Sequence, residues 1–245
     1  MRAARLLAGF AALLLLGGCS GLSWHVVSPL TEQGQRNLGF LISGLGMTLA
    51  LSLTAMAIST VLGLLVALPA LSQRRWLRVV NRVYVETVRA VPILVLILWV
   101  YYGLPVVAGL SIGVFWAGVI ALALSDSAFQ AEIFRAGVQS VAKGQVEAAR
   151  ALSLSRAATM RLVILPQAIR RILPALGNQF VQVLKMSSLV SVIGMQELTR
   201  KANELVVTEY RPLEIYTILV LEYLALVLLV SAGVRWMERR LAIAD

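Results

Sequence analysis

Long apolar stretches limit what this sequence can fold into. Two of them, from Asn37 to Gln73 and from Ala90 to Ser125, contain no charged residue, and a third from Ile215 to Val234 contains only Glu222. A helix that crosses a membrane needs about 20 predominantly apolar residues. Only 14% of the 245 residues are charged, which is too few to cover the surface of a water-soluble domain. We therefore predict an all-α integral membrane protein.

The positive charges predict the topology, because cytoplasmic loops of membrane proteins are enriched in Lys and Arg. Five arginines fall within 72–89, seven Arg or Lys residues within 135–171, and three arginines within 235–245. These segments, including the C-terminus, are predicted to be cytoplasmic. The five predicted helices are 46–71, 112–134 and 213–234, which run inward, and 90–104 and 172–193, which run outward. The segment 195–212 is then placed outside, although it also carries basic residues.

The first 20 residues form a separate segment. Arg2 and Arg5 precede an apolar run that ends in small residues, which is the pattern of a secretory signal. The sequence Leu-Gly-Gly-Cys, ending at Cys19, also resembles the lipobox of bacterial lipoproteins, in which the cysteine is lipidated. A short uncleaved anchor helix is the alternative. We expect residues 21–45 to lead in from the outer face and residues 46–245 to form the membrane domain.

The basic stretch 135–171 cannot span a bilayer, because its charges recur every few residues and each is unfavourable in hydrocarbon. Glu147–Leu154 is rich in Ala, Leu and Arg, which favour helix. Ser155 is placed to cap a second short helix, and Pro166 is expected to end it and can start the next segment. We predict two short helices joined by a turn at the cytoplasmic surface. The regular spacing favours a docking surface for another protein over a solvated loop without a partner.

This stretch resembles the EAA loop of ABC-importer permeases, whose pattern is Glu-Ala-Ala, three residues, Gly, nine residues, Ile, one residue and Leu-Pro. The residues that match are Glu147, Ala148, Ala149, Leu165 and Pro166. Ser153 stands where the family has Gly, and Val163 where it has Ile. That Gly serves a turn, and a left-handed conformation costs a non-Gly residue about 1–2 kcal/mol. The turn is therefore either right-handed here or supported by local hydrogen bonds of Ser153.

Further motifs extend the resemblance from about Gly44 to Arg240. They are VRAVPILVLILWVYYGLP, SAFQAEIFRAGVQSVAKGQVEAARAL, LPQAIRRILPALGNQFVQVLK, SSLVSVIGMQELTR and PLEIY. These segments are similar to the polar amino-acid branch (histidine, glutamine and arginine type) of the type I ABC-importer permeases. The resemblance implies a core of five transmembrane helices in the bacterial cytoplasmic membrane.

The resemblance also implies partners. A second permease subunit, identical or a sister, would complete the translocation pathway. A dimer of cytoplasmic ABC ATPases would receive the EAA loops, and a periplasmic or lipid-anchored binding protein would deliver the amino acid. The residues that couple to the ATPase would be Glu147, Ala148, Ala149, Ser153, Leu165 and Pro166. ATP and Mg would belong to the ATPase, so this chain would need no cofactor and would catalyse no reaction.

Polar residues inside the predicted spans are candidates for the substrate path. Asn178, Gln182 and Lys185 recur at i, i+4 and i+7, which places them on one helical face. Polar groups in membrane helices face the bundle interior or a water-filled path, although hydrogen bonds between helices are the alternative. Asp126 lies deep in the third span. It is expected either to favour a cationic amino acid or to pair with Lys185.

Three other features of the spans have simpler interpretations. Glu132 is expected to pair with a basic residue of the loop, and Glu222 has no assigned role. Small residues recur along one face of the first span, where they would let another helix approach closely. These residues, which we expect to serve packing, are Thr48, Ser52, Ser59 and Gly63.

Several functions are disfavoured by what the sequence lacks. It has no G-x-x-x-x-G-K-[ST] motif, the phosphate-binding loop of ATPases, and no cluster of residues with metal-ligand spacing. Its basic residues lie between apolar stretches without interleaved aromatics. This pattern is not typical of a nucleic-acid-binding protein. A secondary transporter that works without an ATPase is the main alternative, but such folds commonly contain internal repeats and none is evident. A membrane signalling protein would need a soluble domain.

Overall fold

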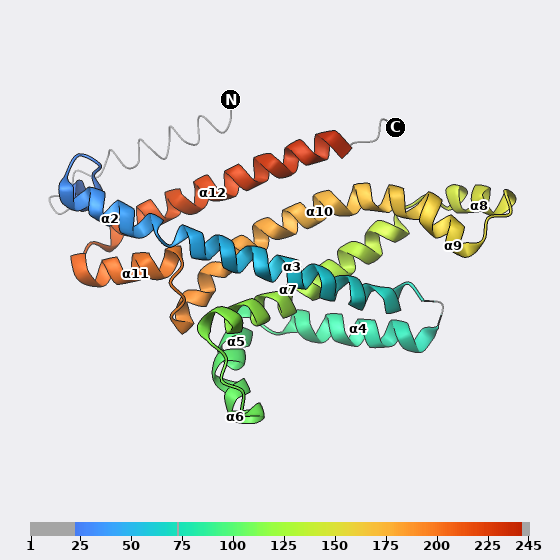
Figure 1. The fold of residues 1–245 in the computed structure, drawn as a ribbon, viewed down its shortest axis with the longest axis horizontal. Coiled ribbons are helices and arrows are strands. Elements are labelled where there is room, and N and C mark those ends of the chain that lie inside the picture. Colours follow the sequence, from blue (N-terminus) through green and yellow to red (C-terminus); the bar gives the residue numbers. More distant parts are fainter. Residues whose placement is uncertain (1–22, 73, 242–245) are drawn as a thin grey trace.

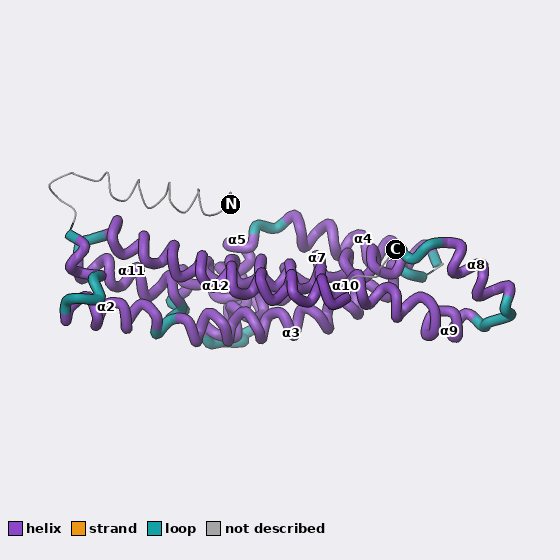
Figure 2. Tube along the Cα trace, turned by 90° about the horizontal axis from the view of Figure 1, so that it is seen from above, coloured by secondary structure: helices purple, strands orange, loops and turns teal. Residues whose placement is uncertain are grey.

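The protein forms a long bundle of helices (Figure 1, Figure 2). The computed structural model describes residues 23–72 and 74–241, and these contain no strand. Their elements, in chain order, are the 3-10 helix η1 (Trp24–Val27), α2 (Glu32–Ile42), α3 (Leu45–Ala70), α4 (Arg75–Ala90), α5 (Ile93–Leu98), the π-helix η2 (Trp99–Gly103), α6 (Leu104–Ala108), α7 (Val114–Gln139), α8 (Lys143–Ala151), α9 (Arg156–Thr159), the π-helix η3 (Met160–Ile164), α10 (Leu165–Met186), the 3-10 helix η4 (Ser187–Ile193), α11 (Leu198–Glu209) and α12 (Pro212–Leu241). The predicted N-terminal segment 1–20, with Cys19, lies outside the described residues.

Helices α3 and α7 pack side by side along the centre of the bundle (Figure 1). The small-residue face predicted on the first span is buried, and Ser59 has no exposed surface. A Cβ atom added at Gly63 would lie 2.7 Å from Cβ of Gln130 on α7. The absence of a side chain at this position therefore allows the two helices to approach closely. The prediction that this face serves packing is confirmed.

Helix α4 (Arg75–Ala90) lies in a region whose arginines predicted only a cytoplasmic loop. The charge pattern marks a side of the membrane and does not exclude helix, which Arg favours. The helix ends at Ala90 because Val91 precedes Pro92 and takes the extended backbone (φ −83°, ψ 122°) typical of a residue before proline. The apolar segment Ile93–Ala108 then leaves the bundle at 93° to α4 (Figure 1).

The number of spans differs from the predicted five when length and hydropathy alone are considered. Within the described residues, Glu32–Ala70, Val114–Gln139 and Pro212–Arg240 can each cross a membrane, and the bent pair of α4 with Ile93–Ala108 adds a fourth if it is one span. The predicted span 172–193 is helical, as α10 followed by η4. Helix α10 is not among the candidate spans, because arginines near its start and polar residues along it lower its hydropathy.

The end of the bundle opposite α8 is closed by polar contacts between segments far apart in the sequence. The Glu209 carboxylate accepts hydrogen bonds from Asn37 Nδ2 at 3.0 Å and Gln33 Nε2 at 2.8 Å. The Ser23 backbone N–H donates to Glu214 Oε1 at 2.8 Å. These bonds attach the predicted lead-in segment 21–45 to α11 and to the first turn of α12.

We expect Gly63→Ala to lower the free energy of unfolding by about 1–3 kcal/mol, the usual cost of overpacking. Gly46→Ala is the matched control, because it lies on the same helix and a Cβ there would meet no atom within 4 Å. The control should be neutral or slightly stabilising, since Ala favours helix over Gly. Thermal unfolding in detergent measures both, and equal stability of the two variants would contradict the close α3–α7 contact.

Candidate functional site

The predicted loop helices project beyond one end of the bundle. Helices α8 and α9 extend past the ends of α3, α4 and α7 (Figure 1, Figure 2). Glu147 and Ala148 are exposed on α8, whereas Ala149 is only 3% exposed. Leu152, in the turn after α8, is 76% exposed. The structure thus confirms two short helices joined by a turn, and it leaves polar and apolar groups of that unit accessible to another protein.

The turn after α8 is a left-handed helix cap. Ser153 has φ 56°. Its N–H donates to the Arg150 carbonyl at 2.8 Å, and the Leu154 N–H donates to the Ala149 carbonyl at 3.1 Å. These two bonds define a Schellman motif, in which glycine normally occupies the left-handed position. Both alternatives offered by the sequence are therefore wrong, because the turn is left-handed and the Ser153 hydroxyl makes no hydrogen bond with a described residue.

The second loop helix continues without interruption into the bundle. Ser155 caps it as predicted, because its Oγ accepts the Ala158 N–H at 3.2 Å. Pro166 does not end this helix, contrary to the prediction, and α9, η3 and α10 follow one another directly. In a regular α-helix the Pro166 ring would clash with the carbonyl of Leu162. The π-helical turn Met160–Ile164 widens the backbone just before the proline, so the helix accommodates it.

Two contacts fix the direction of this continuous helix relative to α7. The Arg171 guanidinium donates to the carbonyl of Ser140, at the end of α7. A Cβ at Gly137 would lie 2.2 Å from Cγ1 of Ile172, so α7 and α10 approach closely there. These contacts attach the loop unit to helices that pack in the core.

Asp126 is the centre of a buried polar cluster between α3, α7 and α10. Its side chain accepts hydrogen bonds from Ser59 Oγ at 2.6 Å, Gln130 Nε2 at 2.5 Å and Gln179 Nε2 at 2.6 Å. Asp126 is only 5% exposed. The expected pair with Lys185 is wrong. The carboxylate is hydrogen-bonded by three neutral donors, and Lys185 lies on an exposed part of α10.

Gln130 and Gln179 were not identified from the sequence. Gln130 lies four residues after Asp126 on the same predicted span and is fully buried. A glutamine among small apolar residues was the available signal, since polar groups inside membrane helices seek partners. Gln179 lies beside the predicted residue Asn178, but one residue of helix changes the direction of a side chain by about 100°. Only the packing of α10 shows which of the two faces Asp126.

The predicted polar face of α10 is exposed in this chain. Asn178, Gln182 and Lys185 are all exposed, and Asn178 Nδ2 lies 3.5 Å from Oε1 of Glu238 on α12. The three residues thus share an accessible face, as their spacing predicted. Their part in a substrate path remains a prediction, because an accessible face is also available to a neighbouring subunit.

Glu132 and Glu222, in two of the predicted spans, differ in their partners. Glu132 pairs with Arg135, with Oε2 2.6 Å from Nη2, as the sequence predicted. Both carboxyl oxygens of Glu222 are inaccessible and have no hydrogen-bond partner among the described residues. Glu222 borders an apolar cavity of about 310 Å³ formed with α2, α3 and α11.

Comparison with known proteins gives the family. Residues 59–243 match the family described as binding-protein-dependent transport system inner membrane component. The chain belongs to this family. The permease is 41% identical over 205 residues to the glutamine transport system permease protein GlnP of Escherichia coli (strain K12), covering 83% of this chain and 93% of that protein. It is 39% identical over 205 residues to the probable glutamine ABC transporter permease protein GlnM of Bacillus subtilis (strain 168), covering 84% and 94%.

Solved structures agree with this assignment. The crystal structure of an amino acid ABC transporter with histidines superimposes with a TM-score of 0.80 at 45% identity, covering 84% of this chain and 96% of that one. An inward-facing structure of the MetNI methionine ABC transporter gives a TM-score of 0.74 at 22% identity, covering 85% and 99%, and shows the shared fold. The permease is thus a multi-pass membrane subunit of an ABC importer. It is not itself an enzyme, because a separate subunit hydrolyses ATP.

We expect Ser153→Gly to stabilise the turn of the permease, because glycine adopts the left-handed conformation without the strain of about 1 kcal/mol. Amide hydrogen exchange should show protection of Leu154 increased about fivefold after correction for intrinsic rates. Ser155→Ala removes the neighbouring cap and should have the opposite effect. Unchanged protection in Ser153→Gly would contradict the left-handed cap.

We expect Asp126→Asn to destabilise the permease by about 1–3 kcal/mol, because a carboxamide cannot accept from all three donors. Thermal unfolding measures this loss, and a double-mutant cycle with Gln179→Ala should show coupling between the two positions. Gln182→Ala is the control, because Gln182 lies on the exposed face of α10, the helix that carries Gln179. It should leave the melting temperature unchanged. Additive effects of Asp126→Asn and Gln179→Ala would exclude the direct contact.

Proposed function

We propose that this permease forms the pathway of an ATP-driven importer for polar amino acids, with glutamine as the first substrate to test. GlnP and GlnM are named for glutamine. The arginine transport system permease protein ArtQ of Bacillus subtilis (strain 168) is 35% identical over 206 residues. These relatives support a polar amino acid as the substrate. Its zwitterionic group would have to pass the apolar helices of the bundle.

The observation that carries the proposal is the geometry of α8 and α9. This unit projects past the bundle (Figure 2), exposes Glu147 and Leu152, and continues as one helix into α10. An ATPase that bound the exposed unit would hold a rigid lever, because no flexible joint separates α9 from the core. Closure of two ATPases on ATP binding would then move α10 and open the pathway outward, and hydrolysis would reset it.

The coupling residues act by contact in this proposal. Glu147, Ala148 and Ala149 would dock in a surface cleft of the ATPase, and the Ser153 turn would fix the angle between α8 and α9. Leu165 and Pro166 lie where the π-helical turn meets α10. They would set the shape of the lever, because a proline there prevents a regular α-helix from forming through this point.

The substrate path would lie between two permease subunits, identical or a sister pair. The exposed face of α10 with Asn178, Gln182 and Lys185 would line it, because polar groups in a membrane require water or a partner. Asp126 would support this face from behind through Gln179 at 2.6 Å. A periplasmic or lipid-anchored binding protein would deliver the amino acid at the end formed by α2 and α11.

The basic residues support the proposed orientation. The segments 72–89, 135–171 and 235–245 together carry 15 of the 22 Arg and Lys residues, and this bias marks the cytoplasmic side. The C-terminus would then be cytoplasmic, in the bacterial inner membrane. Labelling of single cysteines introduced at the two ends of α12 from either side of the membrane tests this topology.

The substrate is tested by reconstituting the permease with the ATPase and binding protein that co-purify with it. Glutamine-loaded binding protein should stimulate ATP hydrolysis, and glutamine should accumulate in proteoliposomes only when ATP is supplied. Uptake by the permease alone, driven by an ion gradient, would overturn the proposal. Stimulation by arginine but not glutamine would reassign the substrate within the polar amino acids.

We expect Glu147→Lys to abolish substrate-stimulated ATP hydrolysis, because the exposed carboxylate of α8 would be replaced by a group of opposite charge. Gln145→Lys is the matched control, since it also adds a positive charge at an exposed position of α8. Pull-down of the ATPase and its stimulated activity give the readouts. Normal coupling in Glu147→Lys, or equal loss in both variants, would remove Glu147 from the interface.

A further inference from the structure

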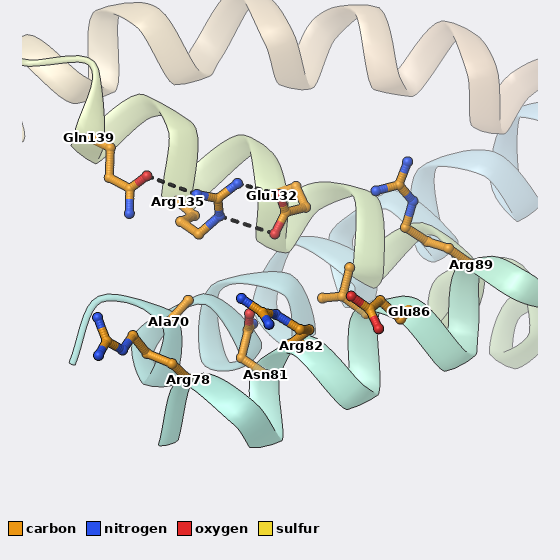
Figure 3. A pocket seen from close by; sticks show the side chains of 10 residues that line it. Ala70, Arg78, Asn81, Arg82, Glu86, Arg89, Glu132, Arg135 and Gln139 are labelled. Atoms are coloured by element: carbon orange, nitrogen blue, oxygen red, sulfur yellow. Dashed lines mark hydrogen bonds and ion pairs between the residues drawn. The ribbon is translucent and has the colours of Figure 1, made fainter. Parts of the chain in front are cut away.

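A cavity of about 350 Å³ lies where the end of α3, the face of α4 that is turned toward α7 and the end of α7 meet (Figure 3). Its charged lining consists of Arg78, Arg82, Glu86 and Arg89 from α4 and Glu132 and Arg135 from α7 (Figure 3). Four arginines therefore face two glutamates, and the lining has an excess of positive charge. The volume is at the low end for small-molecule sites, so the cavity suits a compact anionic group.

The groups on α7 satisfy one another. Glu132 Oε2 lies 2.6 Å from Arg135 Nη2, and Glu132 Oε1 accepts from Arg135 Nε at 3.1 Å. Arg135 Nη1 also donates to Gln139 Oε1 at 2.8 Å. This bidentate pair occupies both carboxylate oxygens, so Glu132 has little capacity left to compensate the arginines of α4.

The arginines of α4 have no such partner. The Arg89 guanidinium lies 4.8 Å from the centroid of the Phe129 ring, a cation–π contact that leaves its N–H groups available. The side chains of Arg78 and Arg82 make no ion pair or hydrogen bond with any residue that the structure describes. They lie four residues apart, one turn of helix, so their guanidinium groups can approach the same ligand.

The neighbouring face of α4 is apolar and exposed. Trp76, Val79, Val80 and Val83 are between 55% and 60% exposed. Val79 and Val83 each follow an arginine of the cavity by one residue, which places them about 100° further round the helix. A ligand with an anionic head and apolar chains would therefore meet both faces of α4 at once, whereas a free anion would use only one.

The position of the cavity in the fold also suits a membrane lipid. It is formed by the end of α7, and α7 leads directly into α8. If α8 docks on a cytoplasmic ATPase, as the proposed function holds and on which this step rests, the cavity opens toward the cytoplasmic leaflet. Anionic lipids there attract clustered Arg and Lys residues, and basic pockets between membrane helices bind their headgroups.

We propose that this cavity binds the phosphate of an anionic glycerophospholipid, with Arg78 and Arg82 as its principal ligands. Guanidinium groups donate in a planar fork that matches two phosphate oxygens. Arg89 and the Glu132–Arg135 pair border the site. The acyl chains lie along Val79 and Val83, so a bound lipid fastens α4 to the ends of α3 and α7.

The test is lipid binding to the complete transporter by native mass spectrometry, with phosphatidylglycerol titrated against phosphatidylcholine. Arg78→Gln with Arg82→Gln should weaken phosphatidylglycerol binding about 30-fold, the loss expected for two arginine–headgroup contacts. Arg74→Gln with Arg75→Gln is the matched control, because it removes the same charge from the start of the same helix but outside the cavity. It should retain most of the affinity at physiological salt, where diffuse attraction is screened.

A second readout separates the possible ligands. Phosphatidylglycerol should raise the melting temperature of the wild type and the control in phosphatidylcholine nanodiscs, and should not raise that of the Arg78 and Arg82 variant. Inorganic phosphate that gave the same increase would overturn the lipid assignment in favour of a free anion. Equal losses of phosphatidylglycerol affinity in both double variants would also overturn it. So would a variant of Arg78 and Arg82 that still binds the lipid but releases the ATPase. Lipid binding is measured without substrate or ATP, so failure of amino-acid transport does not affect the result.

Discussion

The close contact of α3 with α7 determines where most other elements lie. Gly63 lets the two helices approach within a distance that no side chain would permit, and Ser59 on α3 then reaches Asp126 on α7 at 2.6 Å. Because Gln179 also donates to Asp126, the same contact fixes α10. A buried carboxylate with three donors is stable only if all three helices keep their positions, since an unpartnered buried charge is strongly unfavourable.

The mechanical role proposed for the loop unit depends on this core. The continuous helix from Arg156 to Met186 connects the exposed α8–α9 unit to the polar cluster through Gln179. In the proposed mechanism, a force applied at Glu147 would reach the face that carries Asn178, Gln182 and Lys185. The π-helical turn before Pro166 keeps this connection unbroken where a proline would otherwise kink or interrupt the helix. Ser153 adopts a left-handed conformation in the turn between α8 and α9, at a position that the family pattern assigns to glycine.

Much of this organisation could be predicted, because the relevant signals are local in sequence. The apolar stretches gave α3, α7 and α12, and the spacing from Glu147 to Pro166 gave the two loop helices and the Ser155 cap. The helix α4 (Arg75–Ala90) is not predicted, because its arginines mark the cytoplasmic side of the membrane whether or not the segment is helical. The effect of Pro166 was wrong because a π-helical turn depends on five consecutive residues adjusting together, which no single-residue preference reveals.

The sequence by itself determined the membrane class, the family pattern and the residues available to act, because hydropathy and motif spacing are properties of the chain. The tertiary structure decided which of them meet. Asp126 is bound by Ser59, Gln130 and Gln179 and not by Lys185, and Arg78 and Arg82 share a cavity with a pair from α7. Such contacts join residues from different helices. They depend on the rotation and close approach of whole helices, which side-chain packing sets.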